Sequence, residues 1–212
     1  MNSLQQLYIK ANWFEGKHPD FENRIIESLK KVDIGENFTP AEGSIFKAFE
    51  LTKFKDIKVV ILGQDPYPKK GVAIGLAFAV SENTKMPSSL KNIFEVAKIN
   101  SETADKSLVG WGKQGVLLLN TALTTKVGQR KAHVSQWKPF IEAVIDCLKT
   151  RIGIKFFLWG GEAQRQISGS KNMVLCCSHP SPLSWKRTST SFEKCTHFSE
   201  TLNIIDWQKT KQ

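Results

Sequence analysis

A carboxylate and a phenol stand directly after a short apolar run. Val59 to Leu62 are four consecutive apolar residues, which predicts a buried strand, and Asp65 and Tyr67 follow in a loop with two prolines. In an open α/β sheet, ligands bind beyond the carboxyl ends of the strands, so this loop is where chemistry is expected. The plainer alternative is that Asp-Pro marks a turn and that Tyr67 only packs.

Three later apolar runs also lead into residues that can do chemistry. Asn120 closes the second run, and the pair Gly160-Gly161 follows the third. His179 comes two residues after the fourth. Each has a plainer interpretation, as a cap, a bare connection or a structural histidine. Because the carboxyl ends of parallel strands share one edge of a sheet, however, all four ends are predicted to meet at one site.

Strands alternate with helices along the chain, which predicts a parallel sheet between helices. The first 50 residues are predicted to be mainly helical, and a last helix is predicted over residues 192–205. The expected fold class is a three-layer α/β/α sandwich with a central, mainly parallel four-stranded sheet, in a single domain of residues 1–212. The predicted strands cover residues 59–62, 115–120, 154–159 and 172–177, and predicted helices include 21–29, 40–49, 138–149 and segments opening near 86 and 162.

The charge of the chain favours a polyanionic partner. With 30 basic and 20 acidic residues the formal net charge is +10, which promotes phosphate binding through counterion release. No segment resembles a basic amphipathic helix or a polybasic tail, so nucleic acid is favoured over a membrane surface. No run approaches the roughly 18 apolar residues of a membrane span, and no signal-peptide pattern opens the chain, so an intracellular protein is expected.

The cysteines do not suggest a metal site or a disulfide framework, because no pair has C-x-x-C spacing. Cys176 and Cys177 are adjacent in a predicted strand and are expected to point to opposite faces of the sheet. Free thiols in a reducing compartment are therefore predicted at all four positions, which include Cys147 and Cys195. The remaining histidines have no strand-end position and are expected to be structural or exposed: His18, His133 and His197.

The strand-end groups together suit cleavage of a base from a sugar. A carboxylate can orient a water or stabilise a developing cation, and a neutral histidine can donate to a developing anion. The Asn120 amide matches the polar edge of a base, Phe78 can stack on it, and Tyr67 can set the size of the pocket. Such cleavage passes through an oxocarbenium-like transition state, and a base in a duplex must first be flipped out.

Six motifs, in order, resemble those of the family 1 uracil-DNA glycosylases and cover about residues 55–205. One such motif would be weakly specific, whereas six in register are highly specific. The motifs are Gly63-Gln64-Asp65-Pro66-Tyr67, Gly75-Leu76-Ala77-Phe78, 87–93, 115–120, Leu158-Trp159-Gly160 and 179–184.

The resemblance implies monofunctional hydrolysis that releases uracil from DNA without a metal or cofactor. It assigns Asp65 to the attacking water and the sugar cation, and His179 to a hydrogen bond with uracil O2 as negative charge builds on the leaving base. It also implies a uracil pocket in which the Gln64 backbone contacts the base, Tyr67 blocks the thymine methyl, Phe78 stacks, and Asn120 rejects cytosine.

The resemblance further implies a DNA-binding rim. Leu183 resembles the wedge that enters the vacated base stack. Small residues in the phosphate-contacting loops let backbone donors approach DNA closely. These residues are Ser88, Ser89, Gly160, Ser181 and Ser184.

The chain departs from the family pattern after Tyr67. Pro68 stands where the family usually has a histidine that helps to hold the water site, and proline offers no side-chain donor. Lys69 and Lys70 follow directly, which suggests the hypothesis that their charge compensates. Trp185 and Arg187 lie in an atypical stretch after the wedge position, where they would contact the minor groove or, for Trp185, pack.

The expected partner is uracil-containing DNA, single- or double-stranded, bound by a monomer in the cytoplasm, or in the nucleus if the source is a eukaryote or its virus. Whether protein inhibitors of the family bind stays open. The alternatives are a DNA-binding module that lost its water site through Pro68, a glycosylase shifted towards deaminated purines, and a generic nucleotide-binding protein. The last lacks a Walker or G-x-G-x-x-G pattern, and the intact Asp65, Asn120 and His179 disfavour the first.

Overall fold

The centre of the molecule is a sheet of four parallel strands in the order β3-β2-β5-β6. The computed structural model describes residues 1–167, 170–186 and 190–211. Each strand begins and ends within one residue of its predicted position, and the parallel pairing is confirmed. The strands are β2 (Val59–Gly63), β3 (Val116–Asn120), β5 (Lys155–Trp159) and β6 (Met173–Cys177).

Burial differs between the centre and the edge of the sheet. Every residue of β2 and β3 is buried, because side chains on both faces of these strands meet a helical layer. The edge strand β6 is more open, with Cys176 exposed and Cys177 buried. The prediction that these two cysteines point to opposite faces is therefore confirmed.

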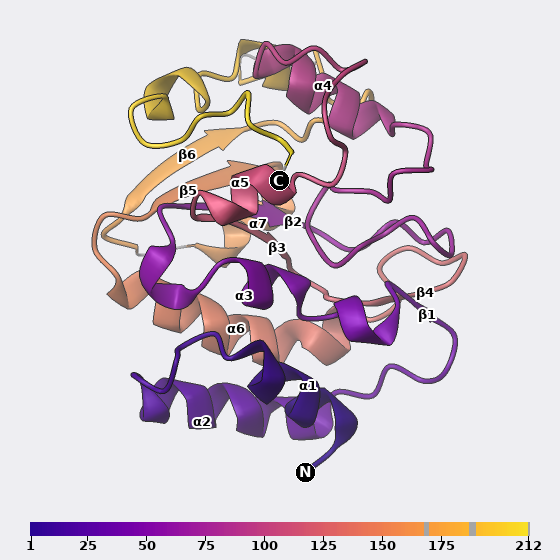
Figure 1. Cartoon of the computed structure of the whole chain (residues 1–212), viewed down its shortest axis with the longest axis vertical. Helices are drawn as coiled ribbons and strands as arrows, with labels where there is room; N and C mark the ends of the chain where they lie inside the picture. The colour runs from indigo at the N-terminus through magenta and orange to yellow at the C-terminus, as the bar shows by residue number, and fades with distance from the viewer. Residues whose placement is uncertain (168–169, 187–189, 212) are drawn as a thin grey trace.

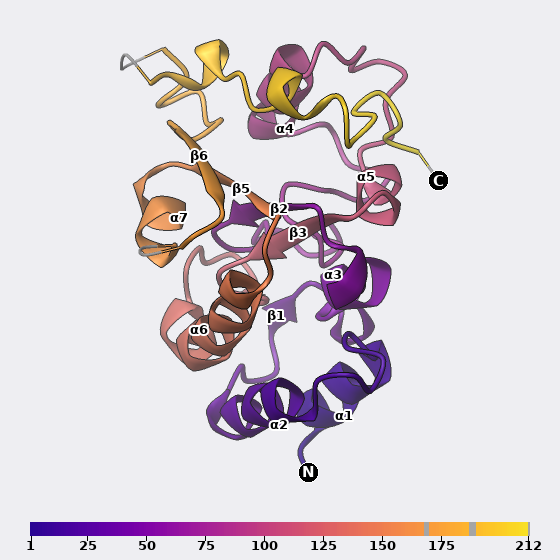
Figure 2. The ribbon, with the colours of Figure 1, turned by 90° about the vertical axis from the view of Figure 1, so that its left-hand side faces the viewer.

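Helices cover both faces of the sheet, which confirms the three-layer prediction (Figure 1). On one side lies α6 (Val134–Thr150), with α2 (Pro19–Ser28) packed on its outer surface and α1 (Ser3–Ala11) beside α2. On the other side lie α4 (Ser88–Val96) and the C-terminal segment (Figure 2). The shorter helices are α3 (Lys47–Leu51), α5 (Val109–Lys113) and α7 (Gly161–Gln166).

The helix predicted over residues 192–205 is wrong. The segment instead forms two 3₁₀ turns, η4 (Phe192–Lys194) and η5 (Ser199–Thr201). The rings of Phe192 and Phe198 both pack on Trp159, with centroids 5.0 and 5.9 Å away. On one α-helix these two side chains would point about 120° apart, so aromatic packing overrides the helical pattern here.

The mainly helical N-terminal region is confirmed, but its second predicted helix is divided into a 3₁₀ turn, η2 (Glu42–Ser44), and α3. A short antiparallel pair, β1 (Phe38–Thr39) with β4 (Thr125–Lys126), was not predicted. This pair anchors the loop 127–133 that follows β4, because the N–H of Val127 donates to the carbonyl of Asn37 at 3.0 Å. Among the described helices, none has the length and apolar character that a bilayer crossing requires.

Candidate active site

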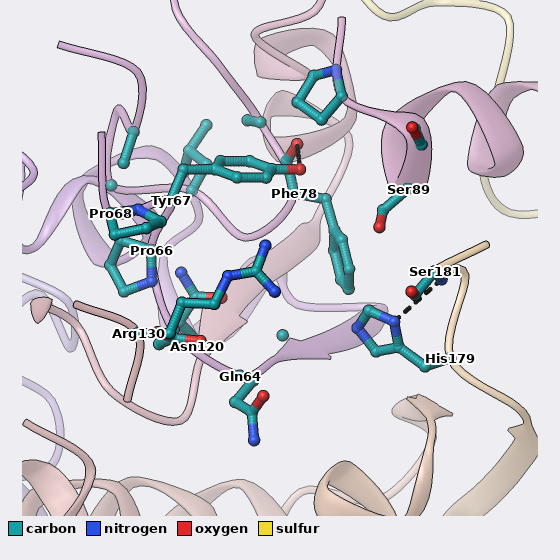
Figure 3. Close-up of a pocket in the computed structure, with 18 of the residues that line it drawn as sticks. Gln64, Pro66, Tyr67, Pro68, Phe78, Ser89, Asn120, Arg130, His179 and Ser181 are labelled. Carbon is teal, nitrogen blue, oxygen red and sulfur yellow. Dashed lines mark hydrogen bonds between the residues drawn. The ribbon is translucent and has the colours of Figure 1, made fainter. Parts of the chain in front are cut away.

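One cavity of about 270 Å³ opens at the carboxyl edge of the sheet (Figure 3). The loop after β2 forms one wall, the end of β3 forms the floor, and the loop after β6 forms the opposite wall. The structure brings all six of the predicted catalytic and uracil-pocket residues to this cavity, and they are Gln64, Asp65, Tyr67, Phe78, Asn120 and His179.

Asn120 is presented at the floor of the cavity by the register of the sheet. In the β2–β3 pair it lies opposite Gly63, and a Cβ at Gly63 would sit only 2.2 Å from Asn120 Oδ1. The missing side chain at Gly63 is therefore what makes room for the amide. Asn120 is 8% exposed, and its amide makes no hydrogen bond to any residue that the structure describes. Both its donor and its acceptor are thus available to a ligand.

Tyr67 and Phe78 form a rigid aromatic wall. The Tyr67 hydroxyl donates to the Phe78 carbonyl at 3.3 Å, and burial raises the pKa of Tyr67, so the phenol stays protonated. Phe78 adopts the left-handed backbone conformation (φ 64°), which is uncommon outside glycine and is often found at functional positions. Its ring lies 5.3 Å from that of Trp159 and 5.9 Å from that of His179.

The protonation state of His179 follows from its hydrogen bond. Its Nδ1 accepts the N–H of Ser181 at 3.0 Å, so the proton of the neutral ring is on Nε2, which faces the cavity (Figure 3). Burial, and then the charges of Arg130 and Lys131, lower the pKa of His179. The ring is therefore a neutral donor at physiological pH.

Gly160 provides the space behind this ring. A Cβ at Gly160 would lie 3.1 Å from the His179 Cβ, and the residue has a positive φ of 91°. Gly160 does not line the main cavity. It lines a neighbouring cavity that also touches His179.

Asp65 is held at one oxygen only. The Lys131 backbone N–H donates to Asp65 Oδ2 at 2.7 Å, and Oδ1 makes no hydrogen bond to the part of the chain that the structure describes. Burial raises the pKa of Asp65, whereas that hydrogen bond and the charges of Arg130 and Lys131 act in the opposite direction. The free oxygen of this carboxylate is placed to hold a water or to face a developing positive charge.

Sequence reasoning missed Arg130, which also lines the cavity (Figure 3). It lies in the loop after β4, and the Gly128 N–H joins this loop to the Pro68 carbonyl at 2.9 Å. Across residues 1–167, 170–186 and 190–211, its guanidinium has no hydrogen-bond or ion-pair partner. Arg130 does not follow a predicted strand, so the strand-end criterion did not select it as a candidate site residue. The basic pair Arg130-Lys131, ten residues after Asn120, was the only sequence signal.

Three of the six residues expected to bind DNA line the cavity. Ser88 and Ser89 open α4, whose first backbone N–H groups have no partner within the helix, and both serines line the cavity together with Ser181. The Asn92 side chain donates to the Pro180 carbonyl at 2.8 Å and so joins α4 to the loop after β6.

The loop after β6 is closely hydrogen-bonded and presents an apolar tip. The Ser184 hydroxyl donates to the His179 carbonyl at 2.9 Å, and the Ser184 N–H donates to the Ser181 carbonyl at 2.9 Å. Leu183 is 72% exposed on this loop. The half-buried Trp185 packs on Phe192, with ring centroids 5.8 Å apart, and Arg187 lies outside the described residues.

The histidines without a strand-end position are structural or exposed, as predicted. His133 is buried against the Thr124 hydroxyl, and His197 is buried with its Nδ1 accepting the Trp159 indole N–H. The exposed His18 packs on the rings of Phe14 and Phe54. The compensation hypothesis for Lys69 and Lys70 gains no support, because both residues are exposed and neither lines the cavity.

Comparison with known proteins gives consistent matches. The model of the uracil DNA glycosylase superfamily matches residues 49–205. A uracil-DNA glycosylase of Neisseria gonorrhoeae is 41% identical over 196 residues, which cover 88% of each chain. One of Campylobacter jejuni is 37% identical over 227 residues, covering 97% of this chain and 96% of its own. The crystal structure of mimivirus uracil-DNA glycosylase has a TM-score of 0.72 at 26% identity, covering 94% of this chain and 82% of its own.

Proposed function

The chain belongs to the uracil-DNA glycosylase superfamily, and on that premise we propose that the cavity at the carboxyl edge of the sheet is its catalytic site. The protein is an enzyme that hydrolyses the N-glycosidic bond between uracil and deoxyribose in DNA. The reaction releases free uracil and leaves an abasic site. The six motifs, including the loop that ends in Tyr67, support the finer assignment to family 1.

The observation that carries the catalytic proposal is the placement of Asp65 and His179 on opposite walls of the cavity. A neutral His179, with its proton on Nε2, can donate to uracil O2 as the leaving base becomes an anion. An ionised Asp65 can stabilise the sugar cation and accept a hydrogen bond from the attacking water. The two groups thus act on opposite charges of one transition state.

The bond changes follow from this arrangement. The C1′–N1 bond breaks first, so that its electron pair moves to uracil and an oxocarbenium-like cation forms on the sugar. Water then adds to C1′ and gives up a proton, with Asp65 as the nearby acceptor. His179 keeps its own proton and only hydrogen-bonds to the anion, because its lowered pKa keeps the ring neutral and a neutral imidazole is a very weak acid.

We propose that pocket shape and amide geometry give the specificity for uracil. The Tyr67 ring, tied to the Phe78 carbonyl, stands where the C5 methyl of thymine would enter. The free Asn120 amide pairs with the O4 and N3–H edge of uracil, and the amino group of cytosine would face its donor. The backbone of Gln64 and the ring of Phe78 complete the contacts.

We further propose that Arg130 places a positive charge on the cavity wall beside Pro68, the position where the family usually has a histidine. The Pro68 carbonyl holds the loop that delivers Arg130, and the same loop provides the Lys131 N–H to Asp65. The guanidinium lowers the pKa of both Asp65 and His179, which keeps each in its active form. An unpaired guanidinium at this position can also donate hydrogen bonds to a DNA phosphate.

Uracil-containing DNA is the partner, and we propose that the rim of Ser88, Ser89 and Ser181 contacts its phosphates while Leu183 enters the base stack. Gly160 and Ser184 act indirectly, since they shape the loop that carries His179. We also propose a monomer that works inside the cell, which fits four free thiols. Gel filtration with and without a uracil oligonucleotide tests the monomer.

The direct test is excision from single-stranded oligonucleotides that carry one uracil, thymine, cytosine or hypoxanthine, followed by alkali cleavage. We expect release of uracil alone by the wild type, and loss of that release in Asp65→Asn. Binding to uracil DNA without release would show that the site lacks the proposed chemistry. Release of hypoxanthine in place of uracil would contradict the roles of Asn120 and Tyr67.

A further inference from the structure

Outside the uracil pocket, two thiols and an imidazole converge at the edge of the sheet. Cys177 ends β6, while Cys195 and His197 belong to the C-terminal segment that follows η4. Their two sulfurs and a ring nitrogen all lie within 4.8 Å of one another. Cys177 and His197 are buried, and Cys195 is half-buried. The sequence spacing hid this cluster because its members come from two separate segments.

The hydrogen bonds of His197 decide which ring nitrogen carries a proton. The Trp159 indole N–H donates to His197 Nδ1 at 3.0 Å, so Nδ1 is an acceptor and the proton of the neutral ring is on Nε2. The Cys195 sulfur lies beside this ring, with one ring nitrogen within 4.8 Å of it. If a metal ion bound Nε2, the proton of the neutral ring would have to move to Nδ1. Nδ1 would then be a donor facing the Trp159 indole N–H, which is also a donor, and their hydrogen bond would be lost. The cluster therefore favours thiol chemistry over metal binding.

The two cysteines of the cluster are therefore unlike each other. Hydrogen bonds from Cys177 and then from His197 lower the pKa of the Cys195 thiol, against the effect of its burial. The same hydrogen bond with Cys195, and then burial, raise the pKa of Cys177. These shifts favour the ionised form of Cys195 and the protonated form of Cys177.

Small molecules can reach this thiolate. Cys195 lines a cavity of about 100 Å³ shared with Cys177 and His197, and also a second cavity of about 570 Å³ beside α4. The other titratable or charged side chains that face Cys195 across these cavities are Glu95, Lys98, Cys176, Glu193 and Lys194. The uracil pocket is separate, since none of the three cluster residues lines it.

We propose that Cys195 and Cys177 form a peroxide-reactive thiol site, in which Cys195 attacks a hydroperoxide and Cys177 resolves the product. The geometry provides a half-buried sulfur that lines two cavities, with an imidazole nitrogen and a second sulfur both within 4.8 Å of it. Nothing in the uracil chemistry uses these residues, so the proposal is independent of the glycosylase mechanism.

The proposed reaction is balanced with hydrogen peroxide as the oxidant. The Cys195 thiolate attacks one peroxide oxygen, so that an S–O bond forms, the O–O bond breaks, and hydroxide leaves. Sulfur is oxidised to a sulfenic acid and the peroxide is reduced. The Cys177 sulfur then attacks the Cys195 sulfur, so that an S–S bond forms and the S–O bond breaks. The departing oxygen takes the Cys177 proton and leaves as water.

The first experiment is iodoacetamide labelling of the intact protein at pH 6.5 and pH 9, read by peptide mass spectrometry. Cys176 is the control, since it is an exposed thiol on β6, next to Cys177, and burial raises the pKa of its thiol. At pH 6.5 we expect Cys195 to react at least about tenfold faster than Cys176. At pH 9 we expect the ratio of the two labelling rates to be smaller. Equal or faster labelling of Cys176 at pH 6.5 would overturn the proposal.

The second experiment is treatment with hydrogen peroxide followed by non-reducing peptide mapping. We expect a Cys177–Cys195 disulfide in the wild type and in Cys176→Ser, and a dimedone-trapped sulfenic acid at Cys195 in Cys177→Ser. Oxidation confined to Cys176 would contradict the proposal. Tight binding of one equivalent of Zn²⁺ that protects both thiols and is lost in His197→Gln would also overturn it, by identifying a metal site.

Discussion

The floor of the uracil pocket, taken together with its walls, is built differently from the rim. On the floor, the Asn120 amide is placed by strand register, Asp65 by a backbone N–H, and His179 by the N–H of Ser181. On the rim, Leu183 is 72% exposed, and the exposed Arg130, where the wall meets the rim, has no partner among the described residues. The floor therefore offers pre-positioned groups to a transition state, whereas the rim offers groups that gain partners only when DNA arrives.

The difference predicts that floor substitutions act on the chemical step and rim substitutions act on substrate capture. The largest effect is expected for Asp65→Asn. The amide keeps an acceptor for the Lys131 N–H but loses the charge, so the single-turnover rate should fall by about 10²- to 10⁴-fold. Binding to a uracil oligonucleotide, measured by fluorescence anisotropy, should change little. Equal losses in rate and binding would place Asp65 outside the chemistry.

Tyr67→Ala tests the floor as a steric gate. Removing the ring opens the wall that the hydrogen bond to the Phe78 carbonyl holds in place, so the thymine methyl can enter. We expect thymine release where the wild type gives none, measured on single-stranded DNA, and slower release of uracil. Tyr67→Phe is the matched control, since it keeps the ring and should still exclude thymine. If Tyr67→Ala releases no thymine, the gate lies elsewhere.

Arg130→Ala tests whether a rim residue also influences the floor. In the proposed mechanism uracil release needs ionised Asp65 and neutral His179, so the rate should fall as the pH drops through the pKa of either group. Arg130 lowers both pKa values, and its removal lets both rise. The acid limb of the pH–rate profile should therefore move to higher pH by roughly half a unit to one unit.

The control for Arg130→Ala is the double variant Lys69→Ala, Lys70→Ala, which removes two exposed charges that do not line the cavity. We expect this variant to keep the wild-type acid limb and nearly the wild-type rate. A shift in the double variant but not in Arg130→Ala would restore the lysine hypothesis and remove the role proposed for Arg130.

Leu183→Ala should have the smallest effect on the chemical step and should act mainly on duplex DNA. The exposed side chain has no role on the floor, and it is needed only where a base must leave a stack. We expect kcat/KM to fall by roughly tenfold on duplex substrates and by less than about twofold on single strands. An equal effect on both substrates would argue against a wedge.

Much of the fold and of the floor could be predicted from local pattern. Continuous apolar runs such as Val59 to Leu62 form strands because both faces of a parallel sheet are buried, so their positions were correct to within one residue. Parallel strands end at one edge of the sheet, so the meeting of Asp65, Asn120 and His179 could be predicted without knowing the loop conformations. The prediction of a helix over residues 192–205 was wrong because the rings of that segment pack on Trp159. A local helical pattern carries no information about such a long-range contact.

The sequence by itself thus determined the sheet, the strand-end groups and the family to which the chain belongs. Only the tertiary structure decided the tautomer of His179, the position of Arg130 beside Asp65, and the meeting of Cys177 with Cys195 and His197. The physical reason is that these features depend on contacts between segments far apart in the chain. A strand pattern depends on residues that are adjacent in the sequence. Contacts between loops form only once the sheet has brought the loops together.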